Sequence, residues 1–368
     1  MLEKGKISAS QLFMMMFLAV VASGVMWIPG ITGKYAHNDL WLSPLLAAIP
    51  GFFTTFIVLR LHKMYPEMTV VQYSEEILGR FAGKAFSLLI LFFYLHISGV
   101  TVRYYAEFIV TNFLHKTPIS VVVITMLAVC ALAVMGGVEV VGRTASLFFP
   151  VFIVPLLAIP PLLGDMEFHQ LFPVLEHGLL PPIKGAFVPG GWFCEMFLLS
   201  FYLPYVRDQQ KTVRTCMYGV AAIMFFFVVV NLFSLFVLGK QVGDFLFPVN
   251  AVFRYISVAD FFENPESLVM AIWILGMFVK ISVFYYAVVL GASQWLGVSD
   301  YRPLALPFGF LIGIFSFWSI PNIDVGIFFD IFTFPLYSPL IQTLLPLLLL
   351  LVGTWRKRRQ TVKQNTAG

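Results

Sequence analysis

The chain has 368 residues, of which 60% are hydrophobic and only 11% charged, with a net charge of +4 and a mean hydropathy of +0.89. A soluble domain carries about 25% charged residues, because its surface must be polar. The composition therefore excludes a soluble globular protein and indicates a chain that lies almost entirely in a lipid bilayer. The small net charge gives no indication of binding to nucleic acid.

Apolar runs separated by charged residues or by Pro and Gly predict ten membrane-spanning helices, at about 20 residues for each crossing. In chain order they lie near residues 9–34, 40–63, 84–113, 118–135, 143–163, 185–206, 212–239, 267–292, 303–321 and 332–354. No small-residue cleavage pattern follows the first run, so we expect that helix to remain in the mature protein. Because no low-complexity linker divides the chain, residues 1–368 are predicted to form one all-α transmembrane domain.

The 23 Lys and Arg residues are distributed unevenly along this arrangement. Sixteen fall on the side that holds both termini, including a basic tail at 355–368, and two lie inside spans. Only five fall on the opposite side: Lys34, Lys116, Lys184, Lys240 and Arg254. Basic residues accumulate in the cytoplasmic loops of membrane proteins. Both termini are therefore predicted to be cytoplasmic.

Two loops on the predicted outer side are longer than the others. Residues 164–184 carry Asp165, Glu167 and Glu176 among prolines. Residues 240–266 contain the segment FPVNAVFRYISVADFF. We expect this segment to form short interfacial helices over the outer mouth.

Two spans carry Gly and Pro in their middles rather than at their ends. The first span contains Ser23, Gly24, Val25, Trp27, Ile28, Pro29 and Gly30, and the sixth contains Pro189, Gly190, Gly191, Trp192 and Glu195. As the first and sixth of ten, they occupy equivalent positions in two repeats of five spans, at about 9–163 and 185–354. An odd number of spans per repeat gives the second repeat the opposite topology. Broken helices at matching positions of inverted repeats indicate a transporter-type binding site.

A break in the middle of the membrane frees backbone amides and carbonyls that lipid cannot satisfy. A bound solute can satisfy them, with amides and the positive end of a half-helix facing a carboxylate and carbonyls facing an ammonium group. A zwitterionic amino acid matches both. The alternative is that Gly and Pro merely kink these helices or allow close packing, as they commonly do in membrane helices.

Ionisable residues inside spans are functional candidates, because a charge at the bilayer centre costs on the order of 3 kcal/mol. Arg103 and Glu107 lie four residues apart and can pair on one helix face, which fits a structural role as well as a gating role. His96 precedes them on the same face and is interpreted as an interior residue. Lys280 has no opposite charge in its own span, so Glu195 is predicted to be its partner. We expect spans one, three, six and eight to bring these charges together at the site.

Aromatic residues beside the breaks are predicted to line the binding pocket. Trp27 and Trp192 would wall it, and one of Tyr285 and Tyr286 should face inward; Tyr285 is taken as the binding residue. No phosphate loop, metal-ligand motif or nucleophile elbow is present, so no catalytic residue, metal or cofactor is expected. The three cysteines (Cys130, Cys194 and Cys216) are interpreted as small hydrophobic residues within helices.

Several segments form a characteristic series along the chain: KGKISASQLF near the N-terminus, the Pro29-Gly30 pair, Glu67-Met68-Thr69 before Gln72-Tyr73, Arg103 with Glu107-Phe108, the segment from Phe247-Pro248 through Arg254-Tyr255-Ile256 to Asp260-Phe261, and Trp273 before Phe278-Val279-Lys280. In their order and spacing they resemble the B subunits of bacterial spore germinant receptors, which are spore germination permeases of the amino acid–polyamine–organocation superfamily. The resemblance covers roughly residues 4–355.

The resemblance implies a ten-helix fold like that of the leucine transporter. It also implies a nutrient germinant, usually an amino acid, bound midway through the inner membrane of the spore, and assembly with A and C subunits. The leading hypothesis is thus a ligand-sensing receptor subunit built on a transporter fold. The alternatives are a proton-coupled amino acid symporter, with Lys280 or Glu195 titrating, and a channel or scaffold subunit without a small ligand.

Overall fold

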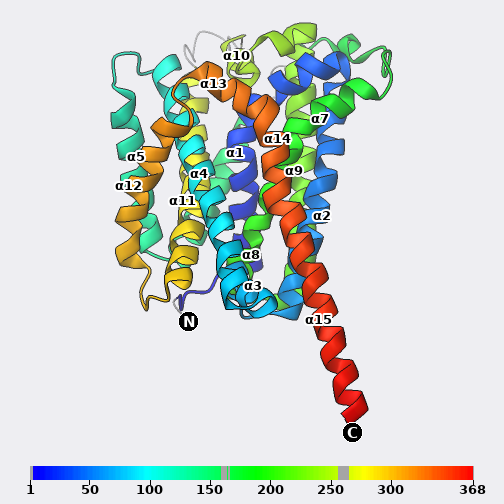
Figure 1. Cartoon of the computed structure of the whole chain (residues 1–368). Coiled ribbons are helices and arrows are strands. Elements are labelled where there is room, and N and C mark those ends of the chain that lie inside the picture. Colours follow the sequence, from blue (N-terminus) through cyan, green and yellow to red (C-terminus); the bar gives the residue numbers. More distant parts are fainter. Residues whose placement is uncertain (1–2, 159–163, 165, 256–264, 368) are drawn as a thin grey trace.

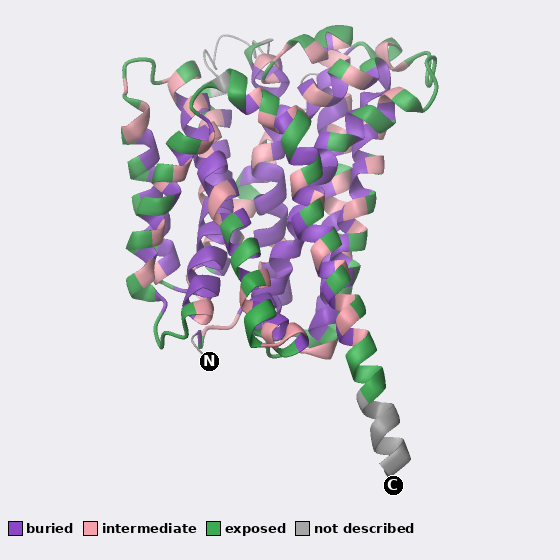
Figure 2. Ribbon diagram, viewed as in Figure 1, coloured by how far each residue is buried: buried purple, intermediate pink, exposed green. Residues whose placement is uncertain are grey.

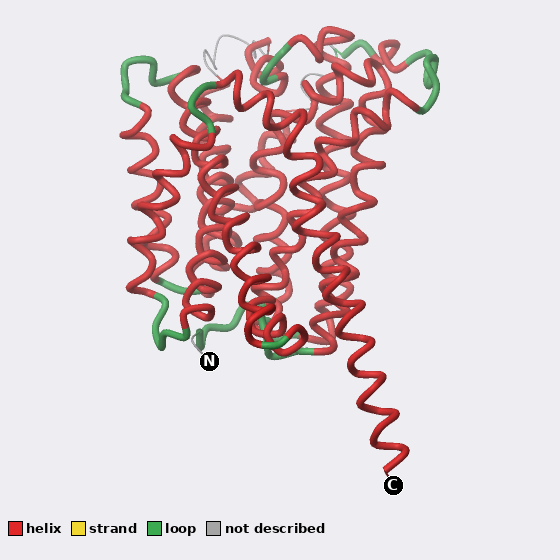
Figure 3. Tube along the Cα trace, in the orientation of Figure 1, coloured by secondary structure: helices red, strands yellow, loops and turns green. Residues whose placement is uncertain are grey.

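The computed structural model describes residues 3–158, 164, 166–255 and 265–367. These residues are mostly helical and contain no strand, apart from one isolated parallel bridge between Ile7 and Val206. Figure 3 shows the helices running between two ends of the molecule, with loops gathered at those ends. The predicted all-α class is confirmed.

The first half of the chain forms a bundle of long helices joined by short turns. Its elements are α1 (Ala9–Ala36), η1 (His37–Leu42), α2 (Ser43–Met64), α3 (Val70–Leu78), α4 (Arg80–Asn112), α5 (Ile119–Met135), α6 (Val138–Ile153) and η2 (Val154–Ala158). α1 is capped by the preceding Ser8, whose hydroxyl accepts a hydrogen bond from the Gln11 amide while the Gln11 side chain accepts one from the Ser8 amide. This reciprocal cap satisfies two of the amides that a helix start leaves free. The short amphipathic α3 was not predicted.

The second half contains more interruptions. Its elements are η4 (Phe168–Leu171), α7 (Leu180–Phe193), η5 (Cys194–Leu198), α8 (Leu199–Tyr202), η6 (Leu203–Tyr205), α9 (Gln209–Leu238), η7 (Gly239–Asp244), α10 (Pro248–Tyr255), α11 (Pro265–Leu296), α12 (Arg302–Ser319), α13 (Ile323–Phe328), η8 (Phe329–Thr333), α14 (Phe334–Pro339), η9 (Leu340–Leu344) and α15 (Leu345–Ala367). η8 and η9 are π-helical turns. Within the predicted interfacial segment α10 is a helix, whereas 256–264 lie outside the described residues.

Eight helical stretches among the described residues are long and apolar enough to cross a membrane. The first of them, Ala9–Met64, contains both α1 and α2, and α5 is apolar but shorter than the others. The predicted count of ten spans is therefore not confirmed by length and composition. Both termini lie at the same end of the bundle, where α15 extends beyond the other helices (Figure 1). That this end is cytoplasmic stays a prediction, as does the division into two repeats.

α1 lies in the middle of the bundle and packs against α7, α9 and α11. Its sequence is apolar on all sides, and most of its residues are buried, which is typical of a helix surrounded by other helices. Figure 2 shows the buried residues concentrated on the inner helices and the exposed residues on the outer ones. The outer helix α12 exposes Leu306, Phe310 and Trp318, side chains that suit contact with lipid.

The predicted break in the first span is wrong, because α1 is one continuous helix through Pro29. Its glycines serve close packing instead: a Cβ on Gly24 would lie 2.6 Å from the Phe227 ring, and one on Gly30 would lie 2.6 Å from a backbone carbonyl. The Thr32 hydroxyl also donates to the Ile28 carbonyl, at 2.8 Å, within the same helix.

The sixth span does depart from α geometry, a few residues later than predicted. α7 continues through Pro189 and both glycines to Phe193, and the chain then passes into the 3₁₀ turn η5 at Cys194. The Gly191 carbonyl, which lies at this change, accepts a hydrogen bond from the Ser338 hydroxyl at 2.7 Å. A side chain of the last span therefore satisfies a backbone group that the change of geometry frees.

Candidate functional site

A small cavity lies among α1, α4, the α7–η5 junction, α11 and the start of the last span. The space available to the centre of a water molecule is about 30 Å³, enough for one or two waters but not for an amino acid. Its polar lining consists of Ser23, Thr101, Tyr104, Glu195 and Asp330. A ligand larger than water would require the surrounding helices to move apart.

Aromatic rings form most of the remaining wall. Trp27, Trp192, Trp273, Phe329 and Phe334 all line the cavity. The Trp192 and Phe334 rings lie 5.7 Å apart between centroids, and the Trp273 indole donates a hydrogen bond of 2.6 Å to a carbonyl of α1. Aromatic faces can hold an apolar side chain or a cation.

Four of the predicted binding residues line this cavity: Ser23, Trp27, Trp192 and Glu195. The others do not. Gly24, Ile28, Pro29, Gly30 and Gly191 are buried in helix packing, and Gly190 faces α2 beside Pro50. The predicted inward position of Tyr285 is also wrong, because its hydroxyl donates to the Ala305 carbonyl of α12.

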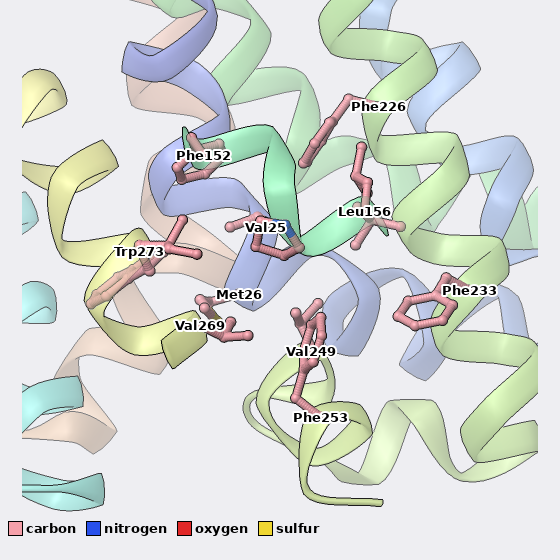
Figure 4. Close-up of a pocket in the computed structure, with 13 residues that line it drawn as sticks. Val25, Met26, Phe152, Leu156, Phe226, Phe233, Val249, Phe253, Val269 and Trp273 are labelled. Atoms are coloured by element: carbon pink, nitrogen blue, oxygen red, sulfur yellow. The ribbon is translucent and has the colours of Figure 1, made fainter. Parts of the chain in front are cut away.

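Val25 lines a second cavity, which Figure 4 shows between α1, α6–η2, α9, α10 and α11. Its volume, measured in the same way, is about 40 Å³. Phe152, Phe226, Phe233 and Trp273 contribute to a wall whose side chains are apolar. This cavity offers no charged side chain to orient a polar ligand, so the candidate site is the first cavity.

Glu195 and Lys280 form an ion pair beside the candidate cavity, as the isolated lysine in span eight predicted. The Lys280 ammonium donates to a Glu195 carboxylate oxygen at 2.7 Å, and the two side chains are 1% and 2% exposed. The ammonium also lies 4.9 Å from the centre of the Phe284 ring. Two opposite charges this deep can persist only as a pair, because each one alone would cost several kcal/mol of desolvation.

Arg103 and Glu107 form the predicted pair, at 2.6 Å, but they do not join the other charges. Arg103 also donates to the Pro321 carbonyl at 3.1 Å and lies against the Phe317 ring, so it faces the end of α12. His96 contacts aromatic rings of the last two spans, including Phe329. The expected convergence of all these charges at one site is therefore wrong, because Arg103 and Glu107 pair away from Glu195 and Lys280.

The residue that sequence reasoning missed is Asp330. It lies in the π-helical turn η8, is 7% exposed, and lines the same cavity as Glu195. Its neighbour is the Tyr104 hydroxyl of α4. π-helical turns inside longer helices often occur at functional sites. The available signal was a single carboxylate among Phe329, Ile331 and Phe332, two residues before the predicted start of span ten.

Comparison with known proteins assigns the chain to a family. A family model described as "Spore germination protein" matches residues 6–324. The chain belongs to the spore germination protein family. Among its relatives, spore germination protein KB of Bacillus subtilis (strain 168) is 28% identical, covering 98% of this chain and 97% of that protein. Spore germination protein YndE of the same organism is 26% identical, covering 96% and 98%.

Two solved structures share the fold of this member of the spore germination protein family. The crystal structure of MhsT in complex with L-phenylalanine has a TM-score of 0.64 at 16% identity, covering 92% of this chain and 89% of MhsT. Mhp1, a nucleobase-cation-symport-1 family transporter in a closed conformation with bromovinylhydantoin bound, has a TM-score of 0.56 at 11% identity, covering 92% and 78%. The leucine-transporter-like fold is confirmed. The family match ends before Asp330, so that residue lies beyond the matched segment.

Proposed function

We propose that this protein is a nutrient-sensing subunit of a spore germinant receptor, which binds a small germinant in the central cavity and thereby triggers germination. Membership of the spore germination protein family and the transporter fold support this role. In the proposed assembly the chain works with A and C subunits in the inner membrane of the spore, with both termini cytoplasmic.

The observation that carries the proposal is the central cavity itself. It combines a buried ion pair, a second carboxylate, three hydroxyl side chains and aromatic walls in the middle of an otherwise apolar bundle. Buried polar groups inside a membrane protein are costly, and they persist mainly where a ligand or transport path needs them. The small volume fits a closed, unliganded state that expands on binding, and an amino acid is the proposed ligand class.

The test uses a pair of matched variants in the purified protein. Thr101→Leu adds bulk to the cavity wall, whereas Thr125→Leu makes the same change on the exposed surface of α5. Amino acids, sugars and nucleosides are screened by thermal stability and by tryptophan fluorescence, since three tryptophans line the cavity. We expect a stabilising compound whose effect is lost in Thr101→Leu and kept in Thr125→Leu. Equal binding by both variants would place the ligand elsewhere.

The second candidate function is a proton-coupled amino acid symporter. The buried Glu195–Lys280 pair favours it, because a carboxylate and an amine in contact can exchange or release a proton. Proteoliposomes with an imposed pH gradient separate the two functions. A receptor subunit binds the amino acid without accumulating it, whereas concentrative uptake that collapses with the gradient identifies a symporter.

A further inference from the structure

The carboxylate of Asp330 is the least compensated charge at the central cavity. It is 7% exposed, and it forms no ion pair with any Lys, Arg or His that the structure describes. Glu195, the other carboxylate of the cavity, is already neutralised by Lys280. The cavity therefore has a net negative charge when both carboxylates are ionised.

The hydrogen-bond donors around Asp330 do not remove this deficit. Tyr104 is a hydrogen-bond partner of Asp330, but its hydroxyl also lies within bonding distance of the Gly326 carbonyl, at 2.9 Å. One hydroxyl proton cannot serve the carbonyl and the carboxylate together. A buried, ionised carboxylate without a cation is costly in a membrane, so Asp330 either takes up a proton or binds a cation in the cavity.

Ser23 provides an independent sign that this cavity lacks a polar occupant. It lines the same cavity from α1, and its buried hydroxyl oxygen has no hydrogen-bond partner among the described residues. A buried polar atom normally finds a partner. An ammonium group carries several donors and could bond both the Ser23 oxygen and the Asp330 carboxylate.

The cavity offers much less to a carboxylate group. α1 is helical through the predicted break, so its amides are not freed to bind an anion. Lys280 is engaged by Glu195, and Arg103 is engaged by Glu107 and the Pro321 carbonyl at α12. An anionic group in this cavity would meet Asp330 without a free cation to offset the repulsion.

We propose that Asp330 is the counter-ion for the ammonium group of the ligand, with Ser23 as a second acceptor and the indole of Trp27 or Trp273 beside it. The ligand class is then an organic amine, and a free carboxylate on the ligand is not needed for binding. This rests on the proposed function, because it assumes that the central cavity is the ligand site. The aromatic walls favour an organic ammonium over a bare inorganic ion, since π faces attract it and also hold its carbon skeleton.

Matched chemical series test the proposal on the purified full-length protein. For the side chains of alanine, leucine and phenylalanine, the probes are the amino acid, the amine without the carboxylate, and the acid without the ammonium. Binding is followed by thermal stability and tryptophan fluorescence, with glucose and inosine as neutral probes. We expect the amine and the amino acid of at least one series to bind and the corresponding acid not to bind. Binding of an acid or a neutral probe alone would overturn the proposal while leaving the cavity as a ligand site.

Variants locate the counter-ion. Asp330→Asn keeps the shape but removes the charge, and Asp324→Asn makes the same change at an exposed position of the same span. We expect Asp330→Asn to weaken amine binding by about 10- to 100-fold, as loss of a charge-assisted hydrogen bond implies, with Asp324→Asn unchanged. If Asp330→Asn is not monodisperse, Ser23→Ala provides the second test, with a smaller loss expected. Unchanged amine affinity in Asp330→Asn or in Ser23→Ala overturns the proposal.

Two further outcomes are informative. One distinguishes an inorganic cation from an organic ammonium group, and the other distinguishes failure of this proposal from failure of the proposed function. Stabilisation by sodium or potassium salts at constant ionic strength, lost in Asp330→Asn and without any effect of amines, would assign the carboxylate to an inorganic ion and overturn the proposal. Failure of every charged and neutral probe to bind the wild-type protein would instead overturn the proposed function itself.

Discussion

Breaking the Glu195–Lys280 pair should destabilise the protein far more than breaking an exposed ion pair. In Lys280→Met the Glu195 carboxylate loses its 2.7 Å partner at a position with 2% exposure, so it must be protonated or remain charged at a high cost. Removing one member of a buried pair costs about 3–5 kcal/mol in the free energy of unfolding. Glu195→Gln should cost a similar amount.

The double variant Glu195→Gln/Lys280→Met distinguishes a missing charge partner from a packing defect. It leaves no unpaired charge, and replacement of a buried pair by neutral side chains is often neutral or stabilising by about 1–4 kcal/mol. We therefore expect it to be more stable than either single variant. The measurement is a double-mutant cycle from denaturant unfolding in mixed micelles.

Arg143→Met is the matched control for this cycle. Arg143 pairs with Glu139 at 3.1 Å, but its side chain is 74% exposed, so the loss should stay below about 1 kcal/mol. A cost of less than about 1 kcal/mol for Lys280→Met, or a double variant as unstable as the sum of the singles, would refute the reasoning.

Three further predictions concern packing and hydrogen bonds. Gly24→Ala should destabilise the protein by about 1–3 kcal/mol in thermal unfolding, because the added carbon lies 2.6 Å from Phe227, whereas Gly313→Ala meets only an ordinary contact at 3.4 Å and should be nearly neutral. Trp273→Phe loses the indole hydrogen bond to α1 and should cost about 1 kcal/mol in the same assay; equal stability would show that this bond contributes nothing. Burial raises the pKa of Glu3, but hydrogen bonds from two amides and two tyrosine hydroxyls lower it below 4.5 overall. The ionised Glu3 carboxylate therefore stabilises the folded protein fully above pH 4.5, and this contribution is lost as the pH falls through the lowered pKa. Glu3→Gln should accordingly be less stable than wild type at pH 6 and lose this difference in strong acid, and a constant difference would contradict the assignment.

The sequence predicted the helices because each long apolar run had to cross or fill a membrane, whatever its neighbours. It also predicted the partner of Lys280, since a lone buried lysine needs a carboxylate and Glu195 was available in a span expected nearby. It failed at Gly24 and Gly30, because glycine permits both a broken helix and a close contact, and only the position of Phe227 and other neighbours decides between them.

The position of Asp330 could not be read from the sequence for a different reason. The predicted tenth span began at residue 332, so the carboxylate fell in the preceding loop. In the structure, helices α13, η8 and α14 follow one another without a gap and place Asp330 inside the membrane-spanning stretch. The prediction for Tyr285 was wrong because the sequence does not show how a helix is rotated about its own axis. The side of α11 that faces the cavity includes Trp273 and Met277, whereas Tyr285 faces α12.

The two π-helical turns of the last span determine how the residues before each turn are rotated about the helix axis relative to the residues after it. A π turn bonds residues five apart instead of four, so each one accommodates an extra residue. Because each residue of an α-helix advances the side chains by about 100°, deleting one residue between Phe329 and Thr333 would turn Asp330's end of the span relative to α14 by about that angle. A homologue one residue shorter in this turn would therefore present a different side chain to the cavity, even with an otherwise similar sequence. Length in this five-residue segment, as much as residue identity, would then determine which chemical group the cavity presents.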